Sequence, residues 1–157
     1  MAVIDFRPYP VQIEELYHHS PGLRTPVREI FGFYCSSRPL LTFIRQLDAA
    51  GVDKAVLATL DCATAHGAAV VPNEALAHLV GQSDRLMGFA SVDPNDSAAP
   101  ASLEHAIETL GLRGLNLDPA LQRFRPDGEG ALRVYEKADA LGIPVTFQMG
   151  LNWAPSA

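Results

Sequence analysis

The chain has 157 residues, a formal net charge of −6 and a mean hydropathy of +0.07. Its 48% apolar and 19% charged residues are typical of a folded globular protein and exclude a disordered chain. Because the charge balance is acidic and the Lys and Arg residues are scattered, neither nucleic acid nor an anionic membrane surface is expected as a partner.

The same composition predicts a cytoplasmic protein. No apolar run reaches the roughly 20 residues of a membrane span, and the first residues do not resemble a signal peptide. Cys35 and Cys62 give neither a disulfide framework nor a CxxC pair. The length predicts a single domain over residues 1–157.

Five short apolar runs predict five β-strands. The runs are continuous rather than alternating, which is typical of parallel strands covered on both faces. The expected strands lie near 3–6, 54–60, 86–92, 113–117 and 143–148. The segments between them carry apolar stripes at helical spacing, formed by Leu40, Phe43, Ile44 and Leu47; Leu76, Leu79 and Val80; Leu103, Ile107 and Leu110; and Leu132, Tyr135 and Leu141. The alternation of strand and helix predicts an α/β fold with right-handed crossovers.

A glycine follows each predicted helix, at positions 51, 81, 111 and 142. The spacings of 30, 30 and 31 residues between these positions match one β-α unit. Glycine just past a helix adopts the left-handed conformation that closes the last turn without a Cβ clash. At the other end of two helices, Asn73 and Ser102 stand where N-caps are expected.

Two architectures fit these units: an open doubly wound sheet, and part of a closed (β/α)₈ barrel. Length favours the open sheet, because eight units of this period would need roughly 240 residues. A doubly wound nucleotide-binding protein, however, has a glycine-rich turn after its first strand. This chain has Phe6-Arg7-Pro8-Tyr9-Pro10 there, and proline has no amide proton to offer a phosphate, which argues against nucleotide binding.

Several segments resemble the amidohydrolase superfamily. VIDFRPYP (3–10) is similar to the first strand of its barrels, in which an Ile-Asp pair leads into His-x-His. RLMGFASVDPND (85–96), LGLRGLNLDPALQRFRPD (110–127) and YEKADALGIPVTFQMG (135–150) resemble strands three, four and five of the branch that includes aminocarboxymuconate-semialdehyde decarboxylase and γ-resorcylate decarboxylase.

The resemblance runs over residues 1–152 and implies a partial TIM-type (β/α) barrel with five parallel strands and four main helices. It also implies zinc or another divalent metal at the carboxyl end of the barrel. The reaction implied is a hydrolysis or a decarboxylation, the latter a lyase reaction, of a small carboxylated aromatic or dicarbonyl compound.

The metal ligands of the superfamily are replaced in this chain. The two first-strand histidines fall on Arg7 and Tyr9, and the fifth-strand histidine falls on Gln148; the later histidine and aspartate would lie beyond Ala157. Arginine stays protonated and a neutral amide is a weak zinc ligand. We therefore expect a metal-independent protein with no cofactor.

Arg7, Tyr9 and Gln148 instead predict a pocket for a small carboxylate. Residues 7 and 9 alternate along one strand and so point to the same side. A guanidinium suits a carboxylate, a phenol can act as acid or base, and an amide can orient the ligand. We assign catalytic roles to Tyr9 and Arg7 and substrate binding to Arg7 and Gln148. The alternative is that these side chains only fill the space of the lost metal, with Arg7 paired to an acid such as Asp118.

Asn116, His19 and Asp93 are further candidates for substrate binding. Asp93 and Asn116 stand at the ends of strands that line the cavity in the superfamily, although caps for the next helices would explain them nearly as well. His19 lies in the connection 10–39, which is long enough to form a lid over a barrel mouth. The aromatic residues of this segment either wall a pocket or bury the segment against the barrel; they are Tyr17, Phe31, Phe33 and Tyr34.

Cys62 and His66 form a Cys-x₃-His pattern after the second strand. Such a pair could hold zinc or act as a nucleophile and its base, but residues of this kind are more often simply part of a loop. His78 and His105 are expected on solvated helix surfaces, and Asp5 is expected to be structural.

A five-stranded part of a barrel has two unpaired edges and an apolar inner face open to water. The chain is therefore expected to be a fragment of a longer protein, to pair with a chain that supplies strands six to eight, or to form a homo-oligomer. Its function is predicted to be that of an enzyme of hydrolase or decarboxylase type acting on a small carboxylate. The alternatives are a non-catalytic binding or regulatory subunit and an unrelated five-stranded module.

Overall fold

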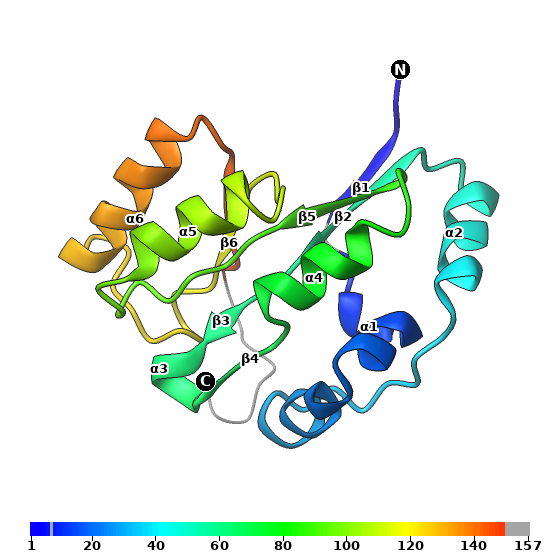
Figure 1. Cartoon of the computed structure of the whole chain (residues 1–157), viewed down its shortest axis with the longest axis horizontal. Helices are drawn as coiled ribbons and strands as arrows, with labels where there is room; N and C mark the ends of the chain where they lie inside the picture. The colour runs from blue at the N-terminus through cyan, green and yellow to red at the C-terminus, as the bar shows by residue number, and fades with distance from the viewer. Residues whose placement is uncertain (7, 150–157) are drawn as a thin grey trace.

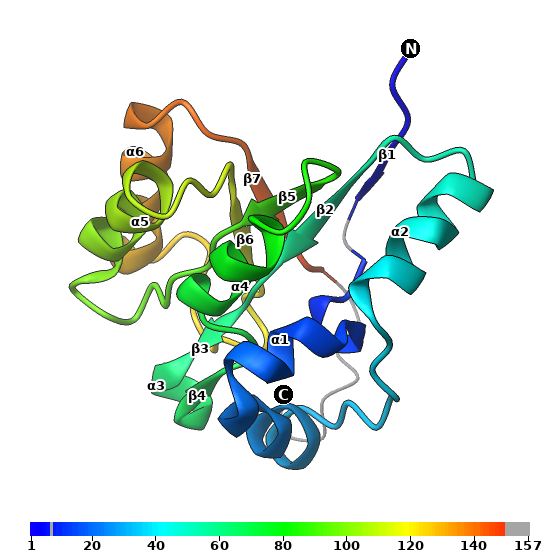
Figure 2. The ribbon, with the colours of Figure 1, turned by 45° about the vertical axis from the view of Figure 1, so that its right-hand side comes forward.

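The structure is a computed structural model that describes residues 1–6 and 8–149. Five parallel strands lie side by side across its centre (Figures 1 and 2). They are β1 (Ile4–Phe6), β2 (Lys54–Ala58), β5 (Leu86–Phe89), β6 (Leu115–Leu117) and β7 (Val145–Phe147). β2 lies between β1 and β5, β6 pairs with β7, and a bridge between Ala90 and Leu115 joins the two groups.

The sequential order of these strands distinguishes the two architectures. In a doubly wound sheet the strand order reverses near the middle, whereas in a (β/α) barrel each strand neighbours the preceding and the following one. The chain follows the barrel order, so the partial TIM-type barrel is confirmed and the open sheet is wrong. Length favoured the wrong architecture because the chain contains five units of a fold that has eight.

Four main helices alternate with the strands: α2 (Leu40–Ala49), α4 (Asn73–Val80), α5 (Ala99–Glu108) and α6 (Glu129–Ala140). In α4 and α5 the predicted stripes pack into the core: Leu79 and Leu103 are both at 0% exposure. The remaining half-buried members are Val80, Ile107 and Leu110. In α6 the buried stripe is instead Ala131, Val134 and Ala138, while Leu132 is 48% exposed. Two of the three residues of this stripe are alanines, and a pattern search that weights large residues misses it.

The glycines after the helices behave as predicted in three of four places. Gly51, Gly111 and Gly142 have φ of 66°, 74° and 63°. Gly81 has φ −63°, because α4 continues into further tight turns in which Gln82 N bonds to Leu79 O. Its predicted left-handed conformation is wrong.

Both predicted N-caps are also wrong. Asn73 is the first helical residue of α4, and its side chain clamps the backbone of Ser91: Nδ2 donates to the carbonyl oxygen at 2.8 Å and Oδ1 accepts from the amide at 3.0 Å. Ser102 lies inside α5, which begins at Ala99 because Pro100 is well accommodated in a first helical turn.

The segment 10–39 contains short helices rather than loop alone. They are η1 (Pro10–Gln12), α1 (Glu14–His19), η2 (Pro21–Leu23) and the π-helical turn η3 (Pro26–Ile30). Backbone hydrogen bonds tie the two ends of the segment together, from Glu14 N to Arg38 O at 2.8 Å and from Arg38 N to Gln12 O at 2.9 Å. Phe31 at 0% and Tyr17 at 6% exposure bury the segment against the rest of the chain, whereas Tyr34 is 72% exposed.

The Cys-x₃-His stretch forms a small hairpin-like element beyond β2. Strand β3 (Asp61–Cys62) pairs antiparallel with β4 (Ala68–Ala69) around the short helix α3 (Ala63–His66). None of the described helices is long and apolar enough to cross a membrane.

Apolar side chains of both edge strands are partly exposed. On β1, Ile4 and Phe6 are each 49% exposed. On β7, Thr146 faces Asn116, so Phe147 points to the opposite, outer face, where its ring lies 5.7 Å from that of Tyr135 on α6 and is 40% exposed. Phe6 is covered on one side by Phe89, whose ring centroid lies 5.3 Å from its own. Closed barrels bury such residues in layers, so this chain leaves part of a core in water.

Candidate functional site

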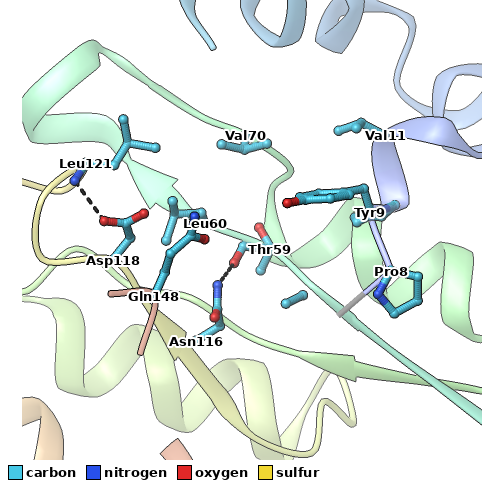
Figure 3. Close-up of a pocket in the computed structure, with 12 residues that line it drawn as sticks. Pro8, Tyr9, Val11, Thr59, Leu60, Val70, Asn116, Asp118, Leu121 and Gln148 are labelled. Carbon is cyan, nitrogen blue, oxygen red and sulfur yellow. Dashed lines mark hydrogen bonds between the residues drawn. The ribbon is translucent and has the colours of Figure 1, made fainter. Parts of the chain in front are cut away.

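A cavity of about 40 Å³ lies where the carboxyl ends of the strands meet the start of the segment 10–39 (Figure 3). In (β/α) barrels the carboxyl ends of the strands carry the functional residues. The cavity is lined by Pro8, Tyr9, Pro10, Val11, Ala58, Thr59, Leu60, Val70, Asn116, Asp118, Leu121 and Gln148. We call it the strand-end cavity. Its volume holds a few water molecules or one carboxylate group rather than a whole ring.

Tyr9 forms one wall of the strand-end cavity. Pro8 and Pro10 restrict the backbone on both sides of it, because each fixes its own φ and disfavours a helical residue before it. The Tyr9 ring packs against Phe33 with 5.5 Å between ring centroids, and the residue is 45% exposed. In Figure 3 its hydroxyl points across the cavity toward the ends of the opposite strands.

Asn116 forms part of the opposite wall and is 3% exposed. Its Nδ2 donates to the carbonyl oxygen of Thr59 at 2.8 Å, and its Oδ1 accepts from Thr146 Oγ1 at 3.1 Å. Asn116 on β6 therefore connects to the neighbouring strand β7 and to the end of β2 on the far side of β5. Thr59, which the sequence did not single out, has a buried Oγ1 with no hydrogen-bond partner among the described residues.

Asp118 is the one carboxylate among the described residues that line this cavity. It is 2% exposed, and its Oδ1 accepts from Leu121 N at 2.9 Å. Pro119 holds it in an extended conformation at the end of β6. A buried carboxylate at a strand end can accept hydrogen bonds or pair with a cation, and a pair with Arg7 is the alternative considered above.

Gln122 holds the strand ends together and was not predicted from the sequence. It is 0% exposed. Its Oε1 accepts from Asp118 N at 2.9 Å, while Nε2 donates to Asp61 O at 2.6 Å and to Val92 O at 2.8 Å. A glutamine in sequence is usually a surface residue, and nothing in its neighbours along the chain marks it as buried.

Gln148 lies across the cavity from Tyr9, as Figure 3 shows, and its backbone amide bonds to Leu117 O at 2.8 Å. Arg7, the predicted clamp, lies outside the described residues, although its neighbour Pro8 lines the cavity. The structure thus brings Tyr9 and Gln148 to one cavity, and the role of Arg7 stays a prediction.

Asp93 and His19 are not among the residues that line the strand-end cavity. Asp93 is 2% exposed, and its carboxylate accepts from Thr64 N at 2.9 Å and from the backbone amide and side chain of Asn95 at 2.9 and 3.0 Å. It holds the turn after β5 and does not cap the next helix, α5, whose N-cap is Ala98. His19 is exposed and stacks on His78 of α4, with 3.8 Å between ring centroids.

Cys62 and His66 are each occupied by structural roles. Cys62 is 0% exposed, and burial raises the pKa of its thiol, with the charges of Asp61, Asp118 and Asp93 adding to the effect. A raised thiol pKa disfavours the thiolate that a metal or a nucleophilic reaction requires. His66 Nε2 lies 2.8 Å from the carbonyl oxygen of Leu121, which can only accept a hydrogen bond.

The described residues do not fit a metal of the kind found in the superfamily. No group of three or more His, Cys, Asp or Glu side chains that could hold an ion occurs within residues 1–6 and 8–149. The polar groups of the cavity wall are a phenol, two amides, a hydroxyl-bearing residue and a single carboxylate, whereas zinc requires three or four imidazole, thiolate or carboxylate ligands. The absence of a metal from the working protein stays a prediction.

Solved structures share this fold. The 5-carboxyvanillate decarboxylase LigW from Sphingomonas paucimobilis aligns with a TM-score of 0.64 and 21% identity, over 92% of this chain and 50% of its own. A probable 2-pyrone-4,6-dicarboxylic acid hydrolase from Acinetobacter baumannii, with citric acid bound, aligns with a TM-score of 0.58 and 18% identity, over 94% and 49%.

A second 5-carboxyvanillate decarboxylase, LigW2 from Novosphingobium aromaticivorans, was solved with manganese and 3-methoxy-4-hydroxy-5-nitrobenzoic acid. It aligns with a TM-score of 0.61 and 19% identity, over 92% of this chain and 49% of its own. This chain thus spans about half the length of the solved structures it matches.

A search of curated proteins gives no match. A family model described as Amidohydrolase matches residues 39–157, well over half of the chain. With the sequential strand order and the solved structures of the same fold, this match shows that the chain belongs to the amidohydrolase-2 family.

Proposed function

We propose that the strand-end cavity binds the carboxylate of a small, single-ring or dicarbonyl acid, and that the chain acts on it as a metal-independent hydrolase or decarboxylase. The observation that carries the proposal is the polar wall formed by Tyr9, Asn116, Asp118 and Gln148 at the functional end of a barrel of this family. The cavity volume of about 40 Å³ suits the acid group alone. The rest of the ligand then lies along the inner face beside Phe6, which is 49% exposed.

Each side chain has a distinct role in this proposal. The Arg7 guanidinium binds the carboxylate, because its planar fork matches two carboxylate oxygens. The Gln148 amide orients the ligand, and Tyr9 is the acid. In a decarboxylation, the carbon–carbon bond to the carboxylate breaks, carbon dioxide leaves, and the electron pair stays on the ring carbon. The Tyr9 hydroxyl supplies the proton for the new carbon–hydrogen bond, and water returns a proton to the phenolate.

A ligand-induced melting-shift screen with small carboxylates, such as benzoate, isophthalate and citrate, tests the binding step. Arg7→Ala is expected to abolish the shifts that the unaltered chain shows, whereas Arg45→Ala, an exposed arginine on α2 away from the cavity, should keep them. Tyr9→Phe should keep the shifts but lose product formation. Equal shifts in Arg7→Ala and the unaltered protein for every carboxylate would exclude the clamp.

A second candidate function is that of a binding or regulatory subunit whose open face is covered by strands from elsewhere. The half-exposed apolar side chains of Ile4, Phe6 and Phe147 support it, because unpaired strand edges with apolar faces associate readily. The covering strands come from another chain, a second copy or further residues of a longer protein. The mass of the protein in solution tests the candidate: association that Phe147→Glu weakens supports it, and a stable monomer at all concentrations contradicts it.

A further inference from the structure

The segment between β1 and α2 forms a second groove, of about 320 Å³, that shares no lining residue with the strand-end cavity. It is lined by Tyr17, Arg24, Val27, Arg28, Phe33, Tyr34, Cys35 and Ser36. We call it the arginine groove. Its volume is at the lower end of the range of small-molecule pockets, which suits a compact ligand with one ring.

Both arginines of the groove lie over aromatic rings. The Arg24 Cζ is 4.3 Å from the centroid of the Tyr17 ring, and the Arg28 Cζ is 5.3 Å from the centroid of the Tyr34 ring. A guanidinium that rests on a ring face loses side-chain freedom but keeps its N–H edges available. The rings therefore orient two donor forks before any ligand arrives.

The charge in this groove is positive in a chain whose net charge is −6. No carboxylate is among the lining residues. Arg24 has no ion pair with any part of the chain that the structure describes, and Arg28 has a single 3.7 Å contact with Glu29 in which both side chains are about two-thirds exposed. Such an exposed pair contributes little, so the groove attracts an anion.

We infer that the arginine groove binds a planar aromatic carboxylate, with the acid group on the guanidinium of Arg24 or Arg28 and the ring against Phe33 and Tyr34. The guanidinium forks select the carboxylate because they donate two parallel hydrogen bonds. The aromatic wall selects a flat ring over a saturated one, because stacked and edge-on ring contacts add to simple burial. This site is independent of the function proposed for the strand-end cavity.

Cys35 provides a local readout, because it lines the groove and is exposed. Cys62, the other cysteine, is buried and its thiol pKa is raised, so a thiol reagent labels Cys35 first. The experiment measures the rate of Cys35 labelling as benzoate or isophthalate is added. The expected result is saturable protection. Compounds that lack the flat ring, the carboxylate or both should protect at least roughly tenfold less well; the three used are cyclohexanecarboxylate, benzamide and inorganic phosphate.

Variants assign the protection to the groove. Whichever of Arg24 and Arg28 holds the acid group, its replacement in Arg24→Gln or Arg28→Gln is expected to weaken protection by roughly tenfold, as expected for loss of a hydrogen bond between charged groups. Arg45→Gln, with an exposed arginine on α2, should match the unaltered chain, and circular dichroism confirms that each variant folds. Tyr9→Phe should also keep full protection, which separates this site from the strand-end cavity.

The inference is overturned if aromatic carboxylates leave the labelling rate unchanged. It is also overturned if cyclohexanecarboxylate or phosphate protects as well as benzoate, or if both arginine variants remain fully protected.

Discussion

Replacing Gln122 tests the physical account of the strand ends. Gln122→Met keeps the side-chain volume close to that of glutamine but removes its hydrogen bonds. Three backbone groups then lose their partner: the Asp118 amide and the carbonyl oxygens of Asp61 and Val92. These groups belong to three successive strand ends, so the substitution affects the geometry of the strand-end cavity as well as stability.

The expected cost follows from burial. Gln122 is 0% exposed, and each buried polar group left without a partner costs about 1–3 kcal/mol. Because some of the groups will find water or relax, the expected loss is about 3–5 kcal/mol for Gln122→Met rather than the full sum. In a chain of this length, that loss lowers the melting temperature by roughly 10 °C.

The assay is urea unfolding followed by circular dichroism, with the free energy of unfolding obtained by linear extrapolation. Gln82→Met is the matched control, because Gln82 is exposed in the turn after α4, and it should change stability by less than about 0.5 kcal/mol. If Gln122→Met were as stable as the unaltered chain, the hydrogen bonds of Gln122 would not hold the strand ends and the reasoning would be refuted.

Two further substitutions probe packing and charge. Gly114→Ala places a Cβ 2.5 Å from the ring of Phe89. We therefore expect the free energy of unfolding to fall by about 1–3 kcal/mol, measured by thermal or urea unfolding. The control is Gly22→Ala, where a Cβ meets nothing within 4 Å, and it should lose far less stability. Burial, followed by neighbouring carboxylates, raises the pKa of Asp61 above its usual 3.8; its charged form therefore destabilises the fold as pH rises through and above that value. Asp61→Asn should melt at a higher temperature than the unaltered chain at pH 7 and lose that advantage near pH 3. A difference in melting temperature that stays constant across this range would contradict the prediction. The same behaviour in the exposed Asp84→Asn would also contradict it.

The regular part of the fold could be predicted from the sequence because it repeats. Five apolar runs and four helical stripes at a period near 30 residues located every main strand and helix. The order of the strands in the sheet could not be read from that period, since the open sheet and the barrel share it. The resemblance of the strand-end segments to the amidohydrolase superfamily favoured the barrel, and the structure shows the sequential order.

The candidate site could be predicted only where a residue's place along a strand fixes where it lies. Asn116 lies within β6, and Tyr9 and Gln148 follow the ends of β1 and β7, so their places along the strands bring them to the carboxyl end of the barrel. Gln122 escaped notice because it reaches that position from a turn after β6. His19 lies in a segment whose short helices turn it toward His78, and no periodic pattern in the sequence carries that information.

The central claim is that this barrel end works without the metal of its family, and the metal content of the purified protein tests it most directly. The measurement is elemental analysis by mass spectrometry after incubation with manganese and zinc and exhaustive dialysis. The account predicts far less than one divalent ion per chain, together with carboxylate-induced melting shifts that a chelator does not alter. One tightly held ion per chain, or shifts that disappear when the chelator is added, would contradict it.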